Sequence, residues 1–178
     1  MLFIPSSIIS GLTFPGVVVH ELSHLLFCRL FKVPVHEVCY FRMGNPAGYV
    51  IHGKPDKWTH QVLISVGPFI INTLLGAFLA FPSALRTFEF AESGTPIDAI
   101  LMWLGVSIAM HAIPSRGDAK AIWATVNAGQ VPYLAKLAVT PLLGLIYILS
   151  FGAVFWLDLI YGFSACLAIP KLLVNMLG

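Results

Sequence analysis

Two histidines and a glutamate lie within five consecutive positions near the N-terminus. The run HELSH at residues 20–24 has the pattern HExxH, with His20 and His24 four residues apart. Four residues make about one turn of an α-helix, so both imidazoles would project from one face and could bind a single Zn²⁺. Glu21, about 100° further around the helix, would stand beside the metal as a candidate general base. The pattern therefore predicts one zinc ion per chain and hydrolytic chemistry.

The surroundings of this run decide between two interpretations of it. HExxH also arises by chance, and the alternative is a set of polar residues satisfied by hydrogen bonds inside a helix bundle. However, the run interrupts an apolar stretch of membrane-spanning length. Ionisable groups in such a stretch are costly unless they line a cavity or bind a ligand. A metal site is therefore the favoured interpretation.

The composition of the chain indicates a membrane protein. Of its 178 residues, 58% are hydrophobic and 10% are charged, whereas about 25% are charged in an ordinary soluble domain. These charges are too few to cover the surface, so much of that surface must face the hydrocarbon of a lipid bilayer. The net charge is only +2 and the basic residues are scattered, which excludes a nucleic-acid-binding protein.

A search for apolar segments of about 20 residues predicts an all-α polytopic membrane protein, a bundle of four to five transmembrane helices. Three spans are expected, at about residues 6–31, 60–85 and 96–113. The third ends before Pro114, because proline breaks helices. The apolar stretch 137–178 fits either one long helix with an interfacial piece or two helices that turn near residues 150–152, and two helices are favoured. Because no repeat or polar linker is visible, residues 1–178 are expected to form one domain.

The distribution of lysine and arginine predicts the orientation of the spans, because basic residues are enriched on the cytosolic side. The connection after the first span holds five basic residues and the connection after the third holds three, whereas the second connection holds Arg86 alone. We therefore expect a multi-pass membrane protein with its N-terminus outside and the metal site near the cytosolic side. With five spans, Asp158 would lie inside the membrane near the outer face, where it would need a partner.

The connection between the first two spans is predicted to form a β-hairpin. Residues 36–42 and 47–52 are short β-prone runs, and the turn signal MGNP lies between them, as in a hairpin. The apolar side chains of the two runs indicate that the hairpin is associated with the membrane interface. A plain cytosolic loop is the alternative.

A third zinc ligand must come from another segment, because catalytic zinc usually takes three protein ligands and leaves one position for water. The end of the third span holds two candidates, His111 and Asp118, and this end and His24 are both expected near the cytosolic side. Pro114 would break the helix and let the Asp118 carboxylate fold back toward the metal. His111, deeper in the span, is the alternative third ligand. Without a metal role, Asp118 would pair with a neighbouring basic residue and His111 would hydrogen-bond an adjacent helix.

An HExxH run in a membrane helix, a Gly-Pro pair at 67–68 followed by Asn72, and a proline-broken helix before Asp118 together resemble the site-2 proteases, which are intramembrane zinc metalloproteases. The resemblance implies a three-helix catalytic core over about residues 6–125, followed here by C-terminal helices at about 133–177. It also implies that Asp118 is the third ligand, that Asn72 helps to orient the substrate, and that the hairpin aligns the substrate as an added strand. For Asn72, an interhelical hydrogen bond is an alternative of equal weight.

We therefore expect a zinc metalloendopeptidase that hydrolyses peptide bonds within or near the transmembrane segments of membrane-protein substrates, as in regulated intramembrane proteolysis. Zinc held by the two histidines and Asp118 would activate a water molecule and polarise the scissile carbonyl. Glu21 would take a proton from that water and pass it to the leaving amine. His111 or Asn72 would donate a hydrogen bond to the developing oxyanion.

The competing function is that of a non-proteolytic zinc-binding membrane protein, namely a sensor, a transporter or an inactive protease relative. A transporter would distribute its ligands along a path and show repeated halves, whereas the candidate ligands here cluster. An inactive relative would have no use for Glu21 beside the metal. These features favour the protease.

Overall fold

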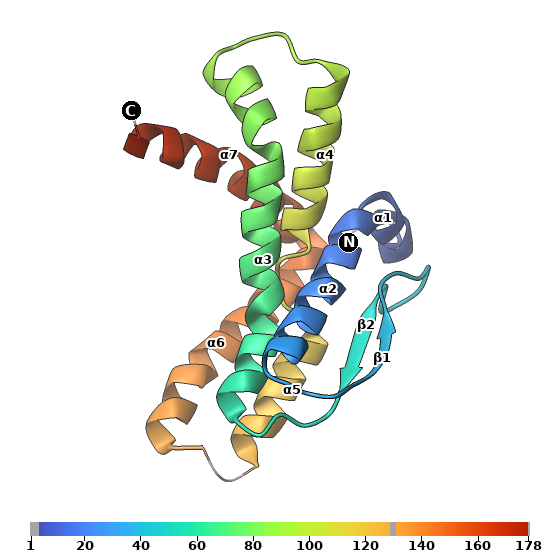
Figure 1. Cartoon of the computed structure of the whole chain (residues 1–178), viewed down its shortest axis with the longest axis vertical. Helices are drawn as coiled ribbons and strands as arrows, with labels where there is room; N and C mark the ends of the chain where they lie inside the picture. The colour runs from blue at the N-terminus through green and yellow to red at the C-terminus, as the bar shows by residue number, and fades with distance from the viewer. Residues whose placement is uncertain (1–3, 129–130, 178) are drawn as a thin grey trace.

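The computed structural model describes residues 4–128 and 131–177 of the chain (Figure 1). Most of the described residues are helical, and one small antiparallel sheet lies between the first long helices, which agrees with the predicted all-α fold and its hairpin. The elements follow in the order α1 (Ser6–Leu12), α2 (Phe14–Leu30), β1 (Val35–Cys39), β2 (Tyr49–His52), α3 (Trp58–Ala84) with a π-helical turn (Leu85–Glu89), α4 (Pro96–Met110), α5 (Arg116–Asn127), α6 (Tyr133–Gly152), a 3₁₀ turn (Ala153–Phe155) and α7 (Leu157–Leu177).

The first apolar segment, expected as one span over residues 6–31, consists of two helices. The helices α1 and α2 meet at an angle of 86°, with Thr13 between them. Pro15 explains the break, because proline lacks an N–H donor and is tolerated in the first turn of a helix but not in its interior. It occupies the first turn of α2. A new helix therefore starts just before Pro15, and this helix carries both histidines of the HExxH run.

The predicted β-hairpin is confirmed. The strands β1 and β2 pair antiparallel, with Val38 opposite Val50 and Cys39 opposite Tyr49. Both strands are shorter than the predicted runs, because residues 40–48 form the connection between them. The hairpin lies alongside α2 (Figure 1), so it is placed against the helix that carries the HExxH run.

The long helix α3 is central to the fold, since it packs against α2, α4, α5 and α7. Its contact with α4 is unusually close at two glycines. A Cβ atom built on Gly76 would lie 2.6 Å from the carbonyl oxygen of Gly105, and a Cβ atom on Gly105 would lie 2.6 Å from that of Gly76. Only glycine fits such an approach of two backbones, which brings α3 and α4 together as a rigid pair.

A short helix that the sequence analysis did not predict, α5, follows the end of α4. Helix α4 ends at Met110, three residues before the expected end of the third span, and after a non-helical segment that contains Pro114 the chain resumes as a helix at Arg116. Ala119, Ile122 and Val126 recur at the three-to-four-residue spacing of one helix face and are buried in a cluster with residues of α6. This packing fixes the start of α5 beside the end of α4.

The C-terminal apolar stretch forms two helices, as favoured, rather than one long helix. They are separated by the 3₁₀ turn at 153–155 and by Trp156, which adopts the left-handed conformation with φ of 64°. The break lies slightly after the expected turn at 150–152. Ser150, near the end of α6, donates a hydrogen bond of 3.0 Å to the carbonyl of Pro114, so this corner is attached to the segment that precedes α5.

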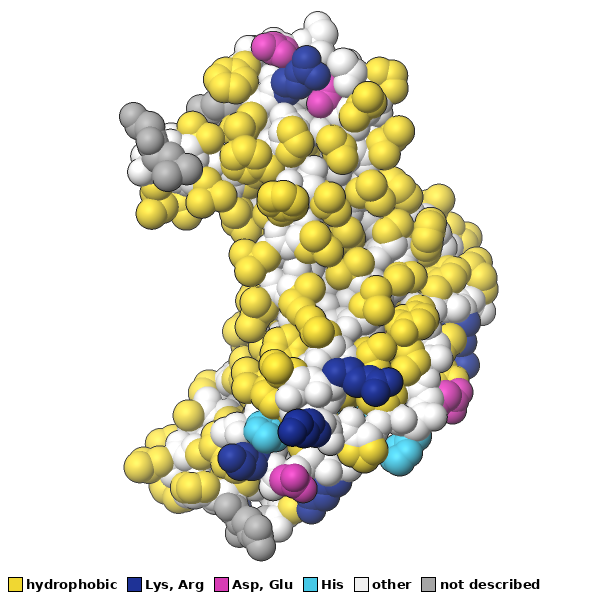
Figure 2. Space-filling model, in the orientation of Figure 1, with side chains coloured by type: hydrophobic (Ala, Val, Ile, Leu, Met, Phe, Trp, Pro, Cys, Tyr) yellow, Lys and Arg dark blue, Asp and Glu magenta, His cyan; other side chains and the backbone are white. Residues whose placement is uncertain are grey.

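Among the described residues, three helices are long and apolar enough to cross a membrane, namely α3, α6 and α7. The bent pair α1–α2 is a fourth candidate, whereas α4 is apolar but shorter. Figure 2 shows charged side chains gathered toward the two ends of the molecule and hydrophobic side chains on the surface between them. This distribution is compatible with a membrane protein.

Candidate metal centre

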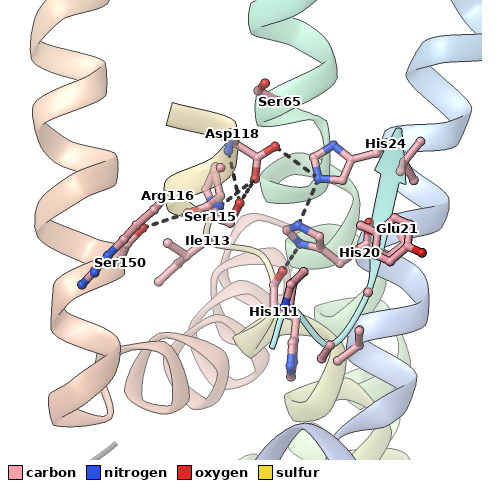
Figure 3. Close-up of a pocket in the computed structure, with 18 of the residues that line it drawn as sticks. His20, Glu21, His24, Ser65, His111, Ile113, Ser115, Arg116, Asp118 and Ser150 are labelled. Carbon is pink, nitrogen blue, oxygen red and sulfur yellow. Dashed lines mark hydrogen bonds and ion pairs between the residues drawn. The ribbon is translucent and has the colours of Figure 1, made fainter. Parts of the chain in front are cut away.

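The structure brings His20, His24 and Asp118 together. The two histidines come from successive turns of α2, and the aspartate comes from the first turn of α5. One ligand atom of each residue lies within 4.8 Å of the others. The two Nε2 atoms are 3.1 Å apart, and Nε2 of His24 is 3.4 Å from Oδ1 of Asp118 (Figure 3). The fold thus joins residues almost a hundred positions apart into one group of three potential metal ligands.

The outer nitrogens of the two histidines show which atoms are free to bind a cation. Nδ1 of His20 lies 2.6 Å from the carbonyl oxygen of His111, and Nδ1 of His24 lies 2.8 Å from that of Ile64. A carbonyl oxygen only accepts hydrogen bonds, so each Nδ1 must carry the proton and each neutral ring presents a lone pair at Nε2. Two lone pairs and a carboxylate oxygen therefore converge, an arrangement that a cation would stabilise.

This donor set fits zinc. Imidazole nitrogens and a carboxylate oxygen are ordinary zinc ligands, and two histidines with one carboxylate form one of the known catalytic sets. Histidines that bind metals almost always donate their other ring N–H to a carbonyl or a carboxylate, as His20 and His24 do here. The ligands and their immediate hydrogen-bond partners are therefore both of the expected kind.

The carboxylate of Asp118 is oriented by the start of α5. Ser115 is the N-cap of this helix and Asp118 is its third residue, and the two form a reciprocal capping box. The backbone N–H and the hydroxyl of Ser115 both donate to Oδ2, over 2.8 Å and 2.6 Å. The other oxygen, Oδ1, faces His24. The interruption between α4 and α5 therefore does more than free the chain, because the first turn of the new helix holds the carboxylate in place.

The imidazole of His111, the alternative third ligand, does not join this group in the described structure. Its Nδ1 lies 3.0 Å from the carbonyl oxygen of Ser107 and therefore carries the proton, so its Nε2 is an acceptor. In this tautomer the ring has no free N–H for an oxyanion. His111 instead contributes its backbone carbonyl, which accepts the bond from His20.

Asn72 is a hydrogen-bonding hub between three helices. It is completely buried, and its Nδ2 donates to the carbonyls of Gly16 on α2 and Ile108 on α4, over 3.3 Å and 3.2 Å. Its Oδ1 accepts a bond of 3.2 Å from Ser23. These contacts match the interhelical alternative, and Asn72 is not among the described residues that line the cavity beside the histidines.

A cavity of about 790 Å³ opens beside the three ligands, within the usual range for binding pockets. Its walls come from the helices α1 to α3, from β2 and the residues before it, from the end of α4, the start of α5 and the segment between them, and from the corner between α6 and α7. His20, Glu21 and His24 all line it. The candidate base and the candidate metal ligands therefore share one space that a substrate could enter.

The hairpin lies directly on Glu21. A Cβ atom built on Gly48 would lie 2.6 Å from Cγ and 2.8 Å from Oε1 of Glu21, and Glu21 is only 7% exposed. Next along the chain, Tyr49 donates its hydroxyl to the carboxylate of Glu37, and this hydrogen bond raises the pKa of the phenol. The phenol therefore stays protonated and does not compete with Glu21 as a base.

Two residues of the site were missed or misplaced by the sequence analysis. With five spans, Asp158 was expected near the outer face and the histidines near the cytosolic side, but Asp158 lines the same cavity as the histidines, because the chain turns beside that cavity between α6 and α7. Its Oδ1 accepts a bond of 2.9 Å from the N–H of Leu159. Ser115 was not singled out, although a serine three positions before an aspartate is a recognisable capping signal.

Comparison of the chain with protein-family models, with curated proteins and with solved structures finds no match in any of the three. The chemistry of the site is therefore deduced from its own donor atoms and their surroundings.

Proposed function

We propose that this protein is an intramembrane zinc metalloprotease, similar to the site-2 proteases, that hydrolyses peptide bonds within or near the transmembrane segments of other membrane proteins. The observation that carries the proposal is the convergence of His20, His24 and Asp118, with both histidine Nδ1 atoms occupied by carbonyls. A glutamate on the wall of the same cavity adds the base that hydrolysis needs.

The three ligands would hold one zinc ion at the cavity wall. When bound, zinc supplies Lewis acidity, which activates water and polarises a carbonyl. The protein contributes the orientation of the ligands and the shelter of the site. The carbonyls of Ile64 and His111 fix the two imidazoles, and the α5 capping box fixes the carboxylate.

Glu21 has the position of the general base. It follows His20 directly in α2, lines the cavity, and is covered by the hairpin. In the proposed reaction it takes a proton from the attacking water and passes it to the leaving amine. A non-proteolytic zinc protein would gain nothing from a buried carboxylate at this point, because zinc is already held by three ligands.

The substrate must lose its helical structure before it is cut, because a helix in lipid satisfies its own backbone groups. The hairpin offers replacement partners. Residues 45–50 and His52 line the cavity, whereas the residues of β1 do not figure in its walls. The free edge of β2 could therefore bind an unwound substrate segment as an added strand, beside His20 and Glu21.

The zinc content of the purified full-length protein tests the metal site. Wild type, Asp118→Ala and Glu21→Gln would be purified in detergent and analysed by elemental mass spectrometry. We expect about one zinc per chain in wild type and in Glu21→Gln, and much less in Asp118→Ala. If Asp118→Ala left the zinc content unaffected, His111 would become the favoured third ligand. A metal-free wild type that also takes up no added zinc would contradict the metal site.

Cleavage tests the reaction itself. Wild type and Glu21→Gln would be reconstituted in liposomes with a panel of single-span model substrates, and the products would be identified by mass spectrometry. Because Glu21→Gln keeps the size of the side chain and removes the base, we expect zinc to remain and cleavage to be lost. A fully active Glu21→Gln would overturn the mechanism, and a zinc-loaded wild type that cuts no substrate would favour a sensor or an inactive relative.

A further inference from the structure

The third ligand differs from the first two in how it is held. His20 and His24 are oriented by backbone carbonyls, which no side-chain substitution removes. Asp118 is oriented by a side chain as well, because the hydroxyl of Ser115 donates to its Oδ2 over 2.6 Å. The backbone N–H of Ser115 donates to the same oxygen over 2.8 Å. Both bonds fall on Oδ2, and Oδ1 is the oxygen that faces His24 (Figure 3).

From this geometry we infer that Ser115 is a positioning residue of the zinc site, whose hydroxyl holds the Asp118 carboxylate so that Oδ1 is presented to the metal. The inference rests on the proposed function and adds a residue to it. Ser115 itself would not be a ligand of the metal, since its hydrogen bonds are made with Asp118. Its effect passes through the carboxylate, whose rotation about the Cβ–Cγ bond it restricts.

The hydroxyl of Ser115 is well placed for this role because it is bonded on both sides. It donates to Oδ2 of Asp118 and accepts a bond of 3.2 Å from the backbone N–H of the same residue. A carboxylate held in advance loses less conformational freedom when the metal binds than one that rotates freely. Partners of this kind commonly change metal affinity by about 10-fold to 100-fold when they are removed.

The alternative is that the capping box only stabilises α5. A second capping box in the chain provides a matched control for that alternative. Thr95 caps α4 in the same way, with its N–H and hydroxyl donating to Oδ2 of Asp98 over 2.8 Å and 2.6 Å. That aspartate faces Arg86 rather than a histidine. Removing the hydroxyl at either position weakens a helix cap, but only Ser115 touches a proposed zinc ligand.

The experiment compares zinc affinities by chelator competition on full-length protein in detergent, for wild type, Ser115→Ala, Ser115→Gly, Ser115→Thr and Thr95→Ala. Glycine is a better N-cap than alanine, so Ser115→Gly removes the hydroxyl with little loss of helix stability. We expect Ser115→Ala and Ser115→Gly to bind zinc at least tenfold more weakly. Ser115→Thr should bind as wild type does, because threonine makes the same bonds at residue 95, and Thr95→Ala should also match wild type.

The absorption bands of Co²⁺ bound in place of zinc add a second measurement, since they respond to the geometry of the ligands. We expect them to shift in Ser115→Gly and to stay unchanged in Thr95→Ala. Equal zinc affinities in wild type, Ser115→Ala and Ser115→Gly would overturn the positioning role, while the zinc site would stand. An equal loss in Ser115→Ala and Thr95→Ala would assign the effect to helix stability. A wild type that binds no zinc would instead refute the proposed function from which the inference starts.

Discussion

The two histidines of the HExxH run are held by groups from outside their own helix. The carbonyl that orients His24 belongs to Ile64 in α3, and the carbonyl that orients His20 belongs to His111, just after α4. The four-residue spacing places both rings on one face of α2, but these distant carbonyls select the nitrogen that is free. The protonation state that suits a metal ligand is therefore a property of the tertiary structure.

The contact between Gly48 and Glu21 predicts a strong effect of one methyl group. In Gly48→Ala the new Cβ would collide with the side chain of Glu21 and would lie 3.0 Å from the carbonyl oxygen of Cys39. The hairpin and Glu21 must then move apart, so we expect cleavage to fall at least tenfold in the liposome assay, because small displacements of catalytic groups are costly. Zinc content should not change.

Gly44→Ala is the matched control for this substitution. Gly44 lies in the same hairpin connection, and its added Cβ would meet only the side chain of Arg42 at 3.6 Å, an ordinary contact. We expect it to cleave as wild type does. Equal activities of the two alanine variants would show that the hairpin does not need its close approach to Glu21.

A substitution at Asn72 can distinguish its two proposed roles, an interhelical hydrogen bond and the orientation of the substrate. Asn72→Ala would remove the interhelical hydrogen bonds that this completely buried amide makes with the carbonyls of Gly16 and Ile108 and with the hydroxyl of Ser23, which should cost about 1–3 kcal/mol of stability. We therefore expect a lower midpoint of thermal unfolding in detergent. Ile70→Ala, on the exposed surface of the same helix, is the control. Unchanged stability with impaired cleavage would instead support a role in orienting the substrate.

At the scale of elements, the crossing of α3 and α4 depends on two glycines. Gly105→Ala would drive a methyl group to 2.6 Å from the carbonyl of Gly76, and such overpacking costs about 1–3 kcal/mol. Since the first half of α3 carries Ile64 and α4 ends just before His111, whose carbonyls orient the two histidines, we expect lower thermal stability together with lower zinc affinity.

Gly144→Ala in α6 tests whether this effect comes from the crossing rather than from the loss of a glycine. A Cβ atom at residue 144 has no neighbour within 4 Å among the described residues, and alanine favours a helix by about 0.5–1 kcal/mol over glycine. We expect this variant to be at least as stable as wild type. A stability loss of similar size in both variants would argue against a special role for the crossing.

The elements that the sequence predicts well are those with a local cause. The hairpin follows from two β-prone runs around a turn signal, and the pair α6–α7 follows from the length of the apolar stretch 137–178. The right-angle bend at Thr13 and the helix α5 were not predicted. Pro15 indicates that the first segment is interrupted, but it does not give the angle at which the chain continues. For α5, the buried face of Ala119 and Ile122 is recognisable only when α6 is known to lie beside it.

In the candidate site, too, some features follow from the local sequence and others depend on the tertiary structure. The motif at residues 20–24 needs only helical spacing and was read from the sequence alone. The order of the spans and the break at Pro114 already favoured Asp118 over His111 as the third ligand, but the capping box that orients the Asp118 carboxylate is visible only in the structure. Asp158, which five spans would place far from the histidines, lines the same cavity, because the position of the turn between α6 and α7 relative to α2 is not encoded in hydrophobicity.

At the scale of the whole molecule, the orientation in the membrane is a prediction that surface labelling can test. Cys39 is partly exposed in the hairpin, while Cys28 and Cys166 are buried. With the hairpin in the cytosol, an impermeant thiol reagent applied to intact cells should not label Cys39, but it should label a cysteine introduced by Ser93→Cys in the exposed connection before α4.

Permeabilised cells and a Cys39→Ser variant serve as controls for this experiment. Permeabilisation should make Cys39 reactive, and Cys39→Ser should abolish that signal. Labelling of Cys39 in intact cells, with protection of the introduced residue 93, would reverse the orientation and place the site on the outer side.

The supports of the three ligands also constrain the route by which a substrate reaches the site. They link α2 to α3 through Ile64, α2 to the end of α4 through His111, and Asp118 to the start of α5 through Ser115. A substrate helix that entered between α2 and α3 would separate His24 from the carbonyl of Ile64 that orients it. Among the described residues, α6 and α7 provide none of these supports, although their corner forms part of the cavity wall. We therefore expect α2, α3 and α4 to keep their relative positions when a substrate binds. The substrate would then enter from the side of α6 and α7.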